Sequence, residues 1–215
     1  MSITYSLHLI DPGTYETIVK DLSTRDLREF GDVESLLTEY HVSDGKRLTL
    51  LDGLRDEFSP NISNRSRFDF NQLFSALVTE QEWDLGKCFG DHALSRPLLA
   101  FPKLNPMRRL FCNYEGWDIE IPEEFSADDA GLFGIWSASK LGEANEVVRQ
   151  FQTEDDAMSY ANSIQWSLFD RLLRPPRQAT RAISTWIGYW DCWQDIRTAI
   201  TTTIKQNKAL GFSMI

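Results

Sequence analysis

The C-terminal stretch, residues 184–215, constrains the fold more than any other part of the chain. Large apolar side chains recur in it at steps of three or four, which is the period of one helix face. They are Trp186, Trp190, Trp193, Ile196, Ile200 and Ile204. Because each tryptophan can bury roughly 150–250 Å², we predict that this helix lies in the core and contacts several other elements.

The end of this helix is also marked in the sequence. Asn207 and Gly211 are residue types that commonly end helices. Residues 209–215 after the helix predict a short terminal strand. We expect the rest of the chain to pack around this helix and strand.

Three more strands are predicted upstream of the C-terminal stretch. Over residues 2–10, apolar residues alternate with polar ones, which predicts a strand that is buried on one face. Residues 117–121 and 132–138 predict two further strands. Together with the terminal strand, these segments would form one small sheet.

The remaining patterns predict helices, most clearly from Asp69 onward and over residues 141–151 and 154–173. Pro97, Pro102 and Pro106 argue against a long helix after Trp83, so residues 83–114 are expected to be irregular. We therefore predict a single α+β domain over residues 1–215. It has a small mixed or antiparallel sheet covered by several helices, and a long C-terminal helix followed by a short terminal strand.

The composition excludes several classes of protein. A hydrophobic content of 42% and a charged content of 25% are ordinary for a folded, soluble chain. No apolar run approaches the roughly 20 residues that a membrane-spanning helix needs, and the first residues lack the pattern of a secretory signal. The cysteines, Cys88, Cys112 and Cys192, are odd in number and form no CxxC pair. They predict three free thiols and a cytoplasmic location.

Acidic residues are concentrated in the middle of the chain. The net charge is −10, and residues 114–156 alone carry 12 acidic and 2 basic residues. Such a surface repels nucleic-acid phosphates and anionic membranes, and it attracts cations and basic proteins. The charge therefore predicts a basic protein partner, and neither nucleic acid nor membrane as a partner.

The clearest local pattern lies in residues 116–122. On a strand, Asp118 and Glu120 share one face, and a carboxylate pair can act as acid and base or hold a divalent cation. The opposite face carries Trp117, Ile119 and Ile121. Over about eight residues, the stretch is similar to the catalytic strand of chitinase-like glycoside hydrolases, whose alternating acidic residues end in a catalytic glutamate.

Two departures from that resemblance favour a solvated acidic face instead of a hydrolase site. Asn113 and Gly116 stand where the hydrolase motif has further aspartates. The chain, at 215 residues, is also short for the barrel of about 250 residues that carries the motif.

Other catalytic and metal-binding patterns are incomplete or missing. Cys88 and His92 are close in sequence, but no second spaced Cys/His pair completes four ligands. The sequence also lacks the common nucleotide-binding, serine-hydrolase and zinc-protease motifs. We therefore predict no catalytic residue, no metal site and no cofactor.

Two hypotheses for function remain. The first is a non-enzymatic, acidic, cytosolic binding protein that occludes a basic protein partner. Immunity proteins that neutralise nuclease toxins are one such class. The residues predicted to bind are Trp117, Asp118, Glu120, Glu123, Glu124, Phe125, Asp128 and Asp129.

The alternative is a small enzyme or ligand-binding protein with a site in residues 83–124. That site would use Asp118 and Glu120, with His92 as a third group. A pocket on which these three side chains converge would favour the alternative. A flat acidic surface with exposed aromatic rings would favour the binding protein.

Overall fold

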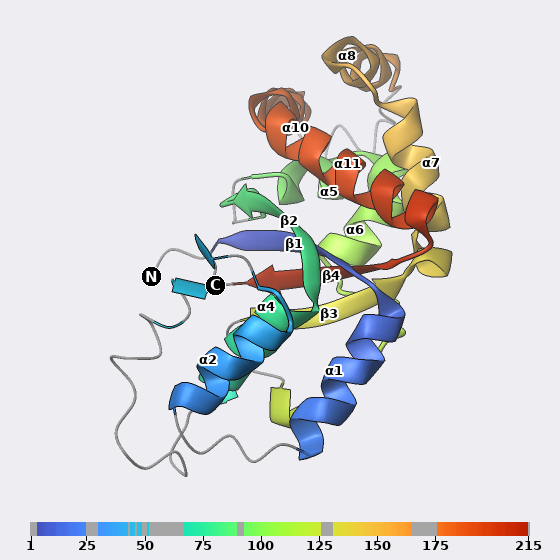
Figure 1. Cartoon of the computed structure of the whole chain (residues 1–215). Helices are drawn as coiled ribbons and strands as arrows, with labels where there is room; N and C mark the ends of the chain where they lie inside the picture. Colours follow the sequence, from blue (N-terminus) through green and yellow to red (C-terminus); the bar gives the residue numbers. More distant parts are fainter. Residues whose placement is uncertain are drawn as a thin grey trace.

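A four-stranded antiparallel sheet runs through the computed structural model and has helices on both faces (Figure 1). The structure describes residues 4–24, 30–42, 44–45, 47–48, 51, 67–89, 93–125, 131–164 and 176–214. The strands lie in the order β2 (Thr79–Gly86), β1 (Tyr5–Ile10), β4 (Ala209–Met214) and β3 (Gly131–Ser137). The predicted α+β fold is confirmed, and its sheet is antiparallel.

Each face of the sheet has its own apolar cluster. The larger cluster includes Trp136, Trp186 and Trp193. It is covered by α5 (Ser95–Ala100), η2 (Pro102–Leu104), α6 (Asn105–Phe111), η4 (Ala138–Leu141), α7 (Gly142–Gln150), α8 (Glu154–Ser163), α10 (Pro176–Gly188) and α11 (Trp190–Gln206). The smaller cluster includes Phe74 and Ile135. It is covered by α1 (Pro12–Thr24), α2 (Phe30–Glu39), α4 (Arg67–Val78) and η3 (Glu123–Phe125).

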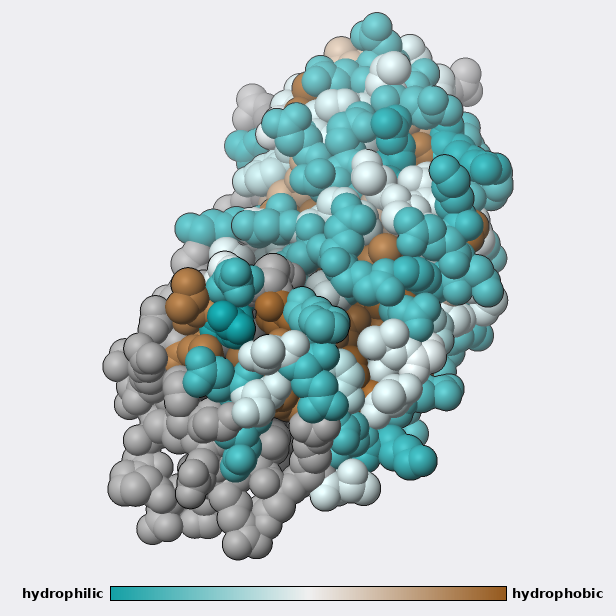
Figure 2. Space-filling model, viewed as in Figure 1, coloured by the Kyte–Doolittle hydropathy of each residue, from teal (hydrophilic) through white to brown (hydrophobic). Residues whose placement is uncertain are grey.

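The long C-terminal helix followed by a terminal strand is confirmed. The apolar face that the sequence predicts for one helix spans two, because α10 ends at Gly188 and α11 begins at Trp190. Asn207 ends α11 in the left-handed conformation, with φ of 52°, and β4 follows. In the view of Figure 2, mostly hydrophilic residues cover the outer side of these helices. None of the described helices is long and apolar enough to cross a membrane.

The N-terminal strand is more buried than the alternation predicts. All six residues of β1 are buried, because β1 lies between β2 and β4 and has helices on both faces. Of its polar residues, Ser6 is 7% exposed and His8 is 4% exposed. His8 Nε2 lies 2.6 Å from the hydroxyl of Ser213, and Nδ1 lies 3.1 Å from that of Thr79, so both ring nitrogens have partners inside the sheet.

The structures predicted for two segments are wrong. Residues 83–114 are not irregular: β2 continues to Gly86, and α5, η2 and α6 follow. Their prolines lie in the first turns of these short helices, where a missing N–H costs little.

Residues 117–121 form no strand. This segment lies beside the edge strand β3, where Asp118 N–H donates to Ile135 O at 3.2 Å. The helix predicted over residues 154–173 is shorter than expected, because α8 ends at Ser163 and Ile164 is extended; residues 165–173 lie outside the described residues.

The cysteine prediction is wrong for two of the three residues. Cys88 and Cys192 form a disulfide across 104 positions of sequence, while Cys112 is a free thiol whose pKa is raised by burial. The sequence could not show this pair, because only the packing of α11 beside β2 brings the two residues together.

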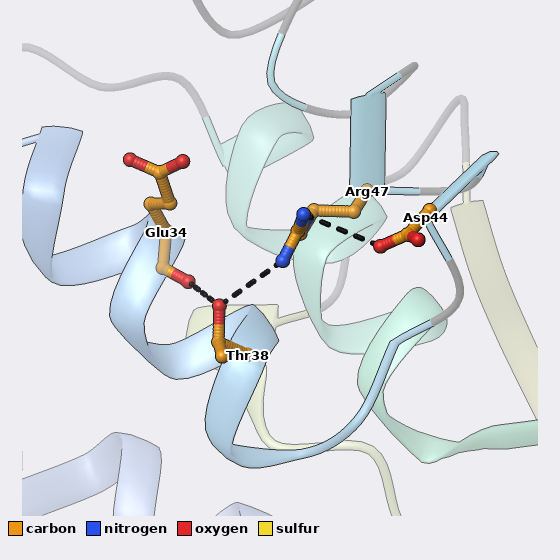
Figure 3. A network of polar contacts seen from close by, with 4 residues as sticks. All are labelled: Glu34, Thr38, Asp44 and Arg47. Carbon is orange, nitrogen blue, oxygen red and sulfur yellow. Dashed lines mark hydrogen bonds and ion pairs between the residues drawn. The ribbon is translucent and has the colours of Figure 1, made fainter.

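A polar network ties Asp44 and Arg47 to the outer side of α2 (Figure 3). Arg47 Nη1 donates to the Thr38 hydroxyl at 3.3 Å, and this hydroxyl donates to Glu34 O at 2.8 Å. Arg47 also pairs with Asp44 at 3.2 Å. Because the Asp44 side chain is 87% exposed, the ion pair adds little stability.

Candidate functional site

The turn between α6 and the segment beside β3 carries the first part of the candidate site. Glu115 N–H donates to Arg109 O at 2.9 Å, which closes the end of α6. Glu115 O accepts from Trp136 Nε1 at 2.9 Å, which ties the turn to β3. Tyr114 and Gly116 have φ of 54° and 82°, so the chain reverses sharply here. The turn is therefore held at both sides.

Two aromatic rings lie next to each other at this turn. Tyr114 and Trp117 are each 38% exposed, and their ring centroids are 6.0 Å apart. Both rings also contact Phe133 of β3, at 5.0 Å in each case. We call Tyr114 and Trp117 the aromatic pair. It is exposed to solvent yet seated on the sheet edge.

Gly134 of β3 makes room for Trp117. A Cβ atom at position 134 would lie 2.0 Å from Cε2 and 2.1 Å from Nε1 of the Trp117 indole. Atoms at such distances overlap, so the edge of the indole packs against β3 only because residue 134 has no side chain.

We expect Gly134→Ala to displace Trp117 and to lower the free energy of unfolding by about 1–3 kcal/mol. Urea denaturation of Gly134→Ala, Trp117→Ala and the double variant would test this. In the Trp117→Ala background the alanine at 134 meets no indole, so its added cost should largely disappear. Additive costs would show that the two residues do not touch.

Asp118 anchors the segment beside β3. Its carboxylate accepts the Ser137 backbone N–H at 2.7 Å and the Ser137 hydroxyl at 2.5 Å. The Ser137 hydroxyl also lies 2.8 Å from that of Ser139. Both carboxylate oxygens are thus used to fix the chain, which is a structural role.

Glu120 is held through its backbone, while its side chain is exposed. The Tyr15 hydroxyl donates to Glu120 O. Ile119 and Ile121, on either side, pack against the smaller core cluster. The two isoleucines therefore point inward and Glu120 points outward, as the alternation in the sequence predicts, although the segment is not a strand.

The contact with Tyr15 predicts a loss of stability at alkaline pH. Burial, and then the charge of Glu120, raise the pKa of Tyr15 to about 12 from its ordinary value of 10.0. The unfolded chain loses this proton first as pH rises above 10, so stability should fall between pH 10 and 12. Unfolding measured against pH should show a weaker decline in Tyr15→Phe than in the wild type. An identical decline in both would exclude Tyr15 as the group responsible.

The structure describes the side chains of two of the other predicted binding residues, Glu123 and Phe125. Phe125 was expected to be an exposed anchor; this is wrong, because it is 3% exposed and stacks on Phe74 with centroids 4.9 Å apart. Glu123 is exposed. The side chain of Glu124 lies outside the described part of the chain, as do Asp128, Asp129 and His92.

A cleft of about 450 Å³ borders the same turn. Arg109 of α6 and Glu143 of α7 form an ion pair at its wall. Its lining consists of Pro106, Arg109, Leu110, Glu115, Gly116, Ser139, Lys140, Gly142, Glu143 and Ala144. Neither Asp118 nor Glu120 lines it, so the carboxylates of the alternative site do not converge there.

The described residues also contain no group of three or more His, Cys, Asp or Glu side chains arranged to hold a metal ion. Comparison of the chain with protein-family models, curated proteins and solved structures found no significant match.

The sequence interpretation missed Tyr114, Gly134 and Ser137. A glycine inside a predicted strand often marks a close approach of another group, which is the role of Gly134 here. Tyr114 stands three residues before Trp117, across the turn residue Gly116, and this spacing was the available signal. The partnership of Ser137 with Asp118 has no sequence signal, because it joins two segments 19 positions apart.

Proposed function

We propose that this protein is a non-enzymatic, acidic binding protein that occludes a basic protein partner, as immunity and inhibitor proteins do. The observation that carries the proposal is the aromatic pair, seated on the sheet edge within an acidic stretch. Every charged residue in residues 114–125 is acidic: Glu115, Asp118, Glu120, Glu123 and Glu124.

The aromatic rings and the carboxylates would have different tasks. Partly exposed aromatic side chains that are already fixed lose little conformational entropy on binding, and they are frequent anchors of protein interfaces. Such rings also attract the ammonium and guanidinium groups of a basic partner. The carboxylates around them would steer the partner toward the surface and raise the association rate.

The geometry supports the alternative, an enzyme or small-ligand site in residues 83–124, less well. Asp118 is occupied by Ser137, Glu120 is exposed, and the nearby cleft is lined by neither of them. A carboxylate pair needs a shared pocket to act as acid and base.

The proposal keeps the cytoplasmic location that the sequence predicts. The Cys88–Cys192 bridge counts against it, because disulfides are rare in reducing compartments.

Site-specific photocrosslinking followed by binding kinetics would test the proposal. A photoreactive amino acid at position 120 should capture a basic protein, whereas one at the exposed residue Met158 on α8 should not. With that protein purified, Glu120→Gln with Glu123→Gln should slow association several-fold at low salt and flatten its salt dependence. Trp117→Ala should speed dissociation by about tenfold or more.

A matched control separates the surface from the overall charge. Glu154→Gln with Asp155→Asn removes the same charge from the exposed start of α8 and should leave both rates nearly unchanged. Equal effects of the two charge variants would mean that the acidic segment keeps the protein soluble but has no specific role in binding. Unchanged dissociation of folded Trp117→Ala, or capture of an acidic protein, would contradict the proposal.

A further inference from the structure

The disulfide joins the sheet to the helix that covers it. It links Cys88, in the turn after β2, to Cys192, in the first turn of α11. The Cα atoms are 6.7 Å apart, within the range that disulfides span. The residues are 5% and 7% exposed, so the bridge is largely shielded from a reductant while the turn lies against α11.

The junction that the bridge closes contains like charges. Asp195 of α11 lies close enough to Asp84 of β2, and to Asp191 of its own helix, for their charges to act on it. Burial, and then the charges of Asp191 and Asp84, raise the pKa of Asp195. Near neutral pH the carboxylate of Asp84 repels that of Asp195 across the contact between β2 and α11. The disulfide therefore joins two elements that pack through apolar side chains but bring the carboxylates of Asp84 and Asp195 near each other.

The turn after β2 also contacts aromatic rings that pack beneath the aromatic pair. Phe89, next to Cys88, stacks on Phe111 at 5.2 Å and meets Phe212 edge-on at 5.9 Å. Tyr114 of the aromatic pair contacts the same Phe212 ring, at 6.2 Å. If the turn left α11, Phe89 would withdraw from rings that support Tyr114.

We propose that the Cys88–Cys192 bridge is a redox-controlled clasp, whose reduction releases the turn after β2 and loosens the aromatic packing under Tyr114. A dithiol reductant supplies two electrons and two protons. Its thiolate attacks one sulfur, its second thiol resolves the mixed disulfide, and it leaves as its own disulfide. Cys88 and Cys192 end as thiols. The clasp does not depend on the proposed function; only its effect on partner binding would.

Hydrogen exchange followed by mass spectrometry on oxidised and dithiothreitol-treated wild-type protein would test the clasp. Reduction should speed amide exchange by about tenfold in residues 84–89 and 190–195, and by less in residues 110–118. Residues 12–24 of α1, on the other face of the sheet, should be unaffected. Cys112→Ser should behave like the wild type, which assigns the effect to the bridge.

A charge variant separates clasp opening from the mere loss of a crosslink. In the reduced protein, Asp195→Asn should slow exchange in residues 84–89 by about threefold, because it removes the repulsion. Glu154→Gln, the same charge change on α8, should not. The proposal is overturned by unchanged exchange on reduction, by equal acceleration in α1, or by an Asp195→Asn effect no larger than that of Glu154→Gln. Mass measurement after thiol blocking that finds no bridge in the oxidised protein would also overturn it.

Discussion

Replacing Trp193 by alanine is expected to lower the free energy of unfolding by about 3–5 kcal/mol. Trp193 is 1% exposed, and its ring centroid lies 5.2 Å from that of Trp186. Its indole N–H donates to Phe151 O at 3.0 Å. The substitution would leave a cavity between α11 and α7 and an unpaired buried carbonyl. Urea denaturation, with the slope compared as well as the midpoint, would measure the loss.

Two controls make this result specific. Tyr189→Ala removes an aromatic ring that is 37% exposed at the break between α10 and α11, and it should cost less than about 1 kcal/mol. Trp186 is equally buried, but no described group accepts from its Nε1. Trp193→Phe should therefore cost more than Trp186→Phe, because only the former breaks a hydrogen bond. An unchanged midpoint for Trp193→Ala would refute its place in the core.

Removing the disulfide is the second change with a large expected effect. Cys88→Ser with Cys192→Ser should lower the free energy of unfolding by about 2–5 kcal/mol. The bridge closes a loop of 104 positions, so breaking it restores much conformational freedom to the unfolded chain. Denaturation without reductant would measure the difference.

The reduced wild-type protein is the natural comparison for this pair of substitutions. It should unfold at nearly the same denaturant concentration as the double variant, whereas Cys112→Ser should stay close to the oxidised wild type. A double variant as stable as the oxidised protein would mean that packing alone holds β2 to α11.

Local patterns predicted the elements whose structure depends mainly on their own residues. The tryptophan spacing predicted a buried C-terminal helical face, and Asn207 predicted its end. Helices α4 and α7 lie where the apolar periodicity placed them. The same reasoning did not predict β2. This edge strand buries only Trp83 and Leu85, and its acidic residues Glu80, Glu82 and Asp84 are exposed, so its sequence lacks a clear apolar alternation. Outward-facing charges are common on edge strands.

The candidate site was predicted in part. Trp117 and Glu120 are exposed as expected, and the stretch around them is acidic. Asp118 was expected to face a partner but binds Ser137, and Phe125 was expected to be exposed but lies against Phe74. Residue type alone does not separate an anchor at an interface from a side chain of the core.

The sequence by itself determined the fold class, the C-terminal helix and strand, and the acidic character of residues 114–125, because periodicity and charge are properties of neighbouring residues. Only the tertiary structure decided which faces meet. The tertiary structure pairs Cys88 with Cys192 and packs the Trp117 indole against β3 at Gly134, where there is no side chain. It also buries both faces of β1. Each of these depends on contacts between segments far apart in the chain, and hydrophobic periodicity reports that a face is apolar without identifying the element that covers it.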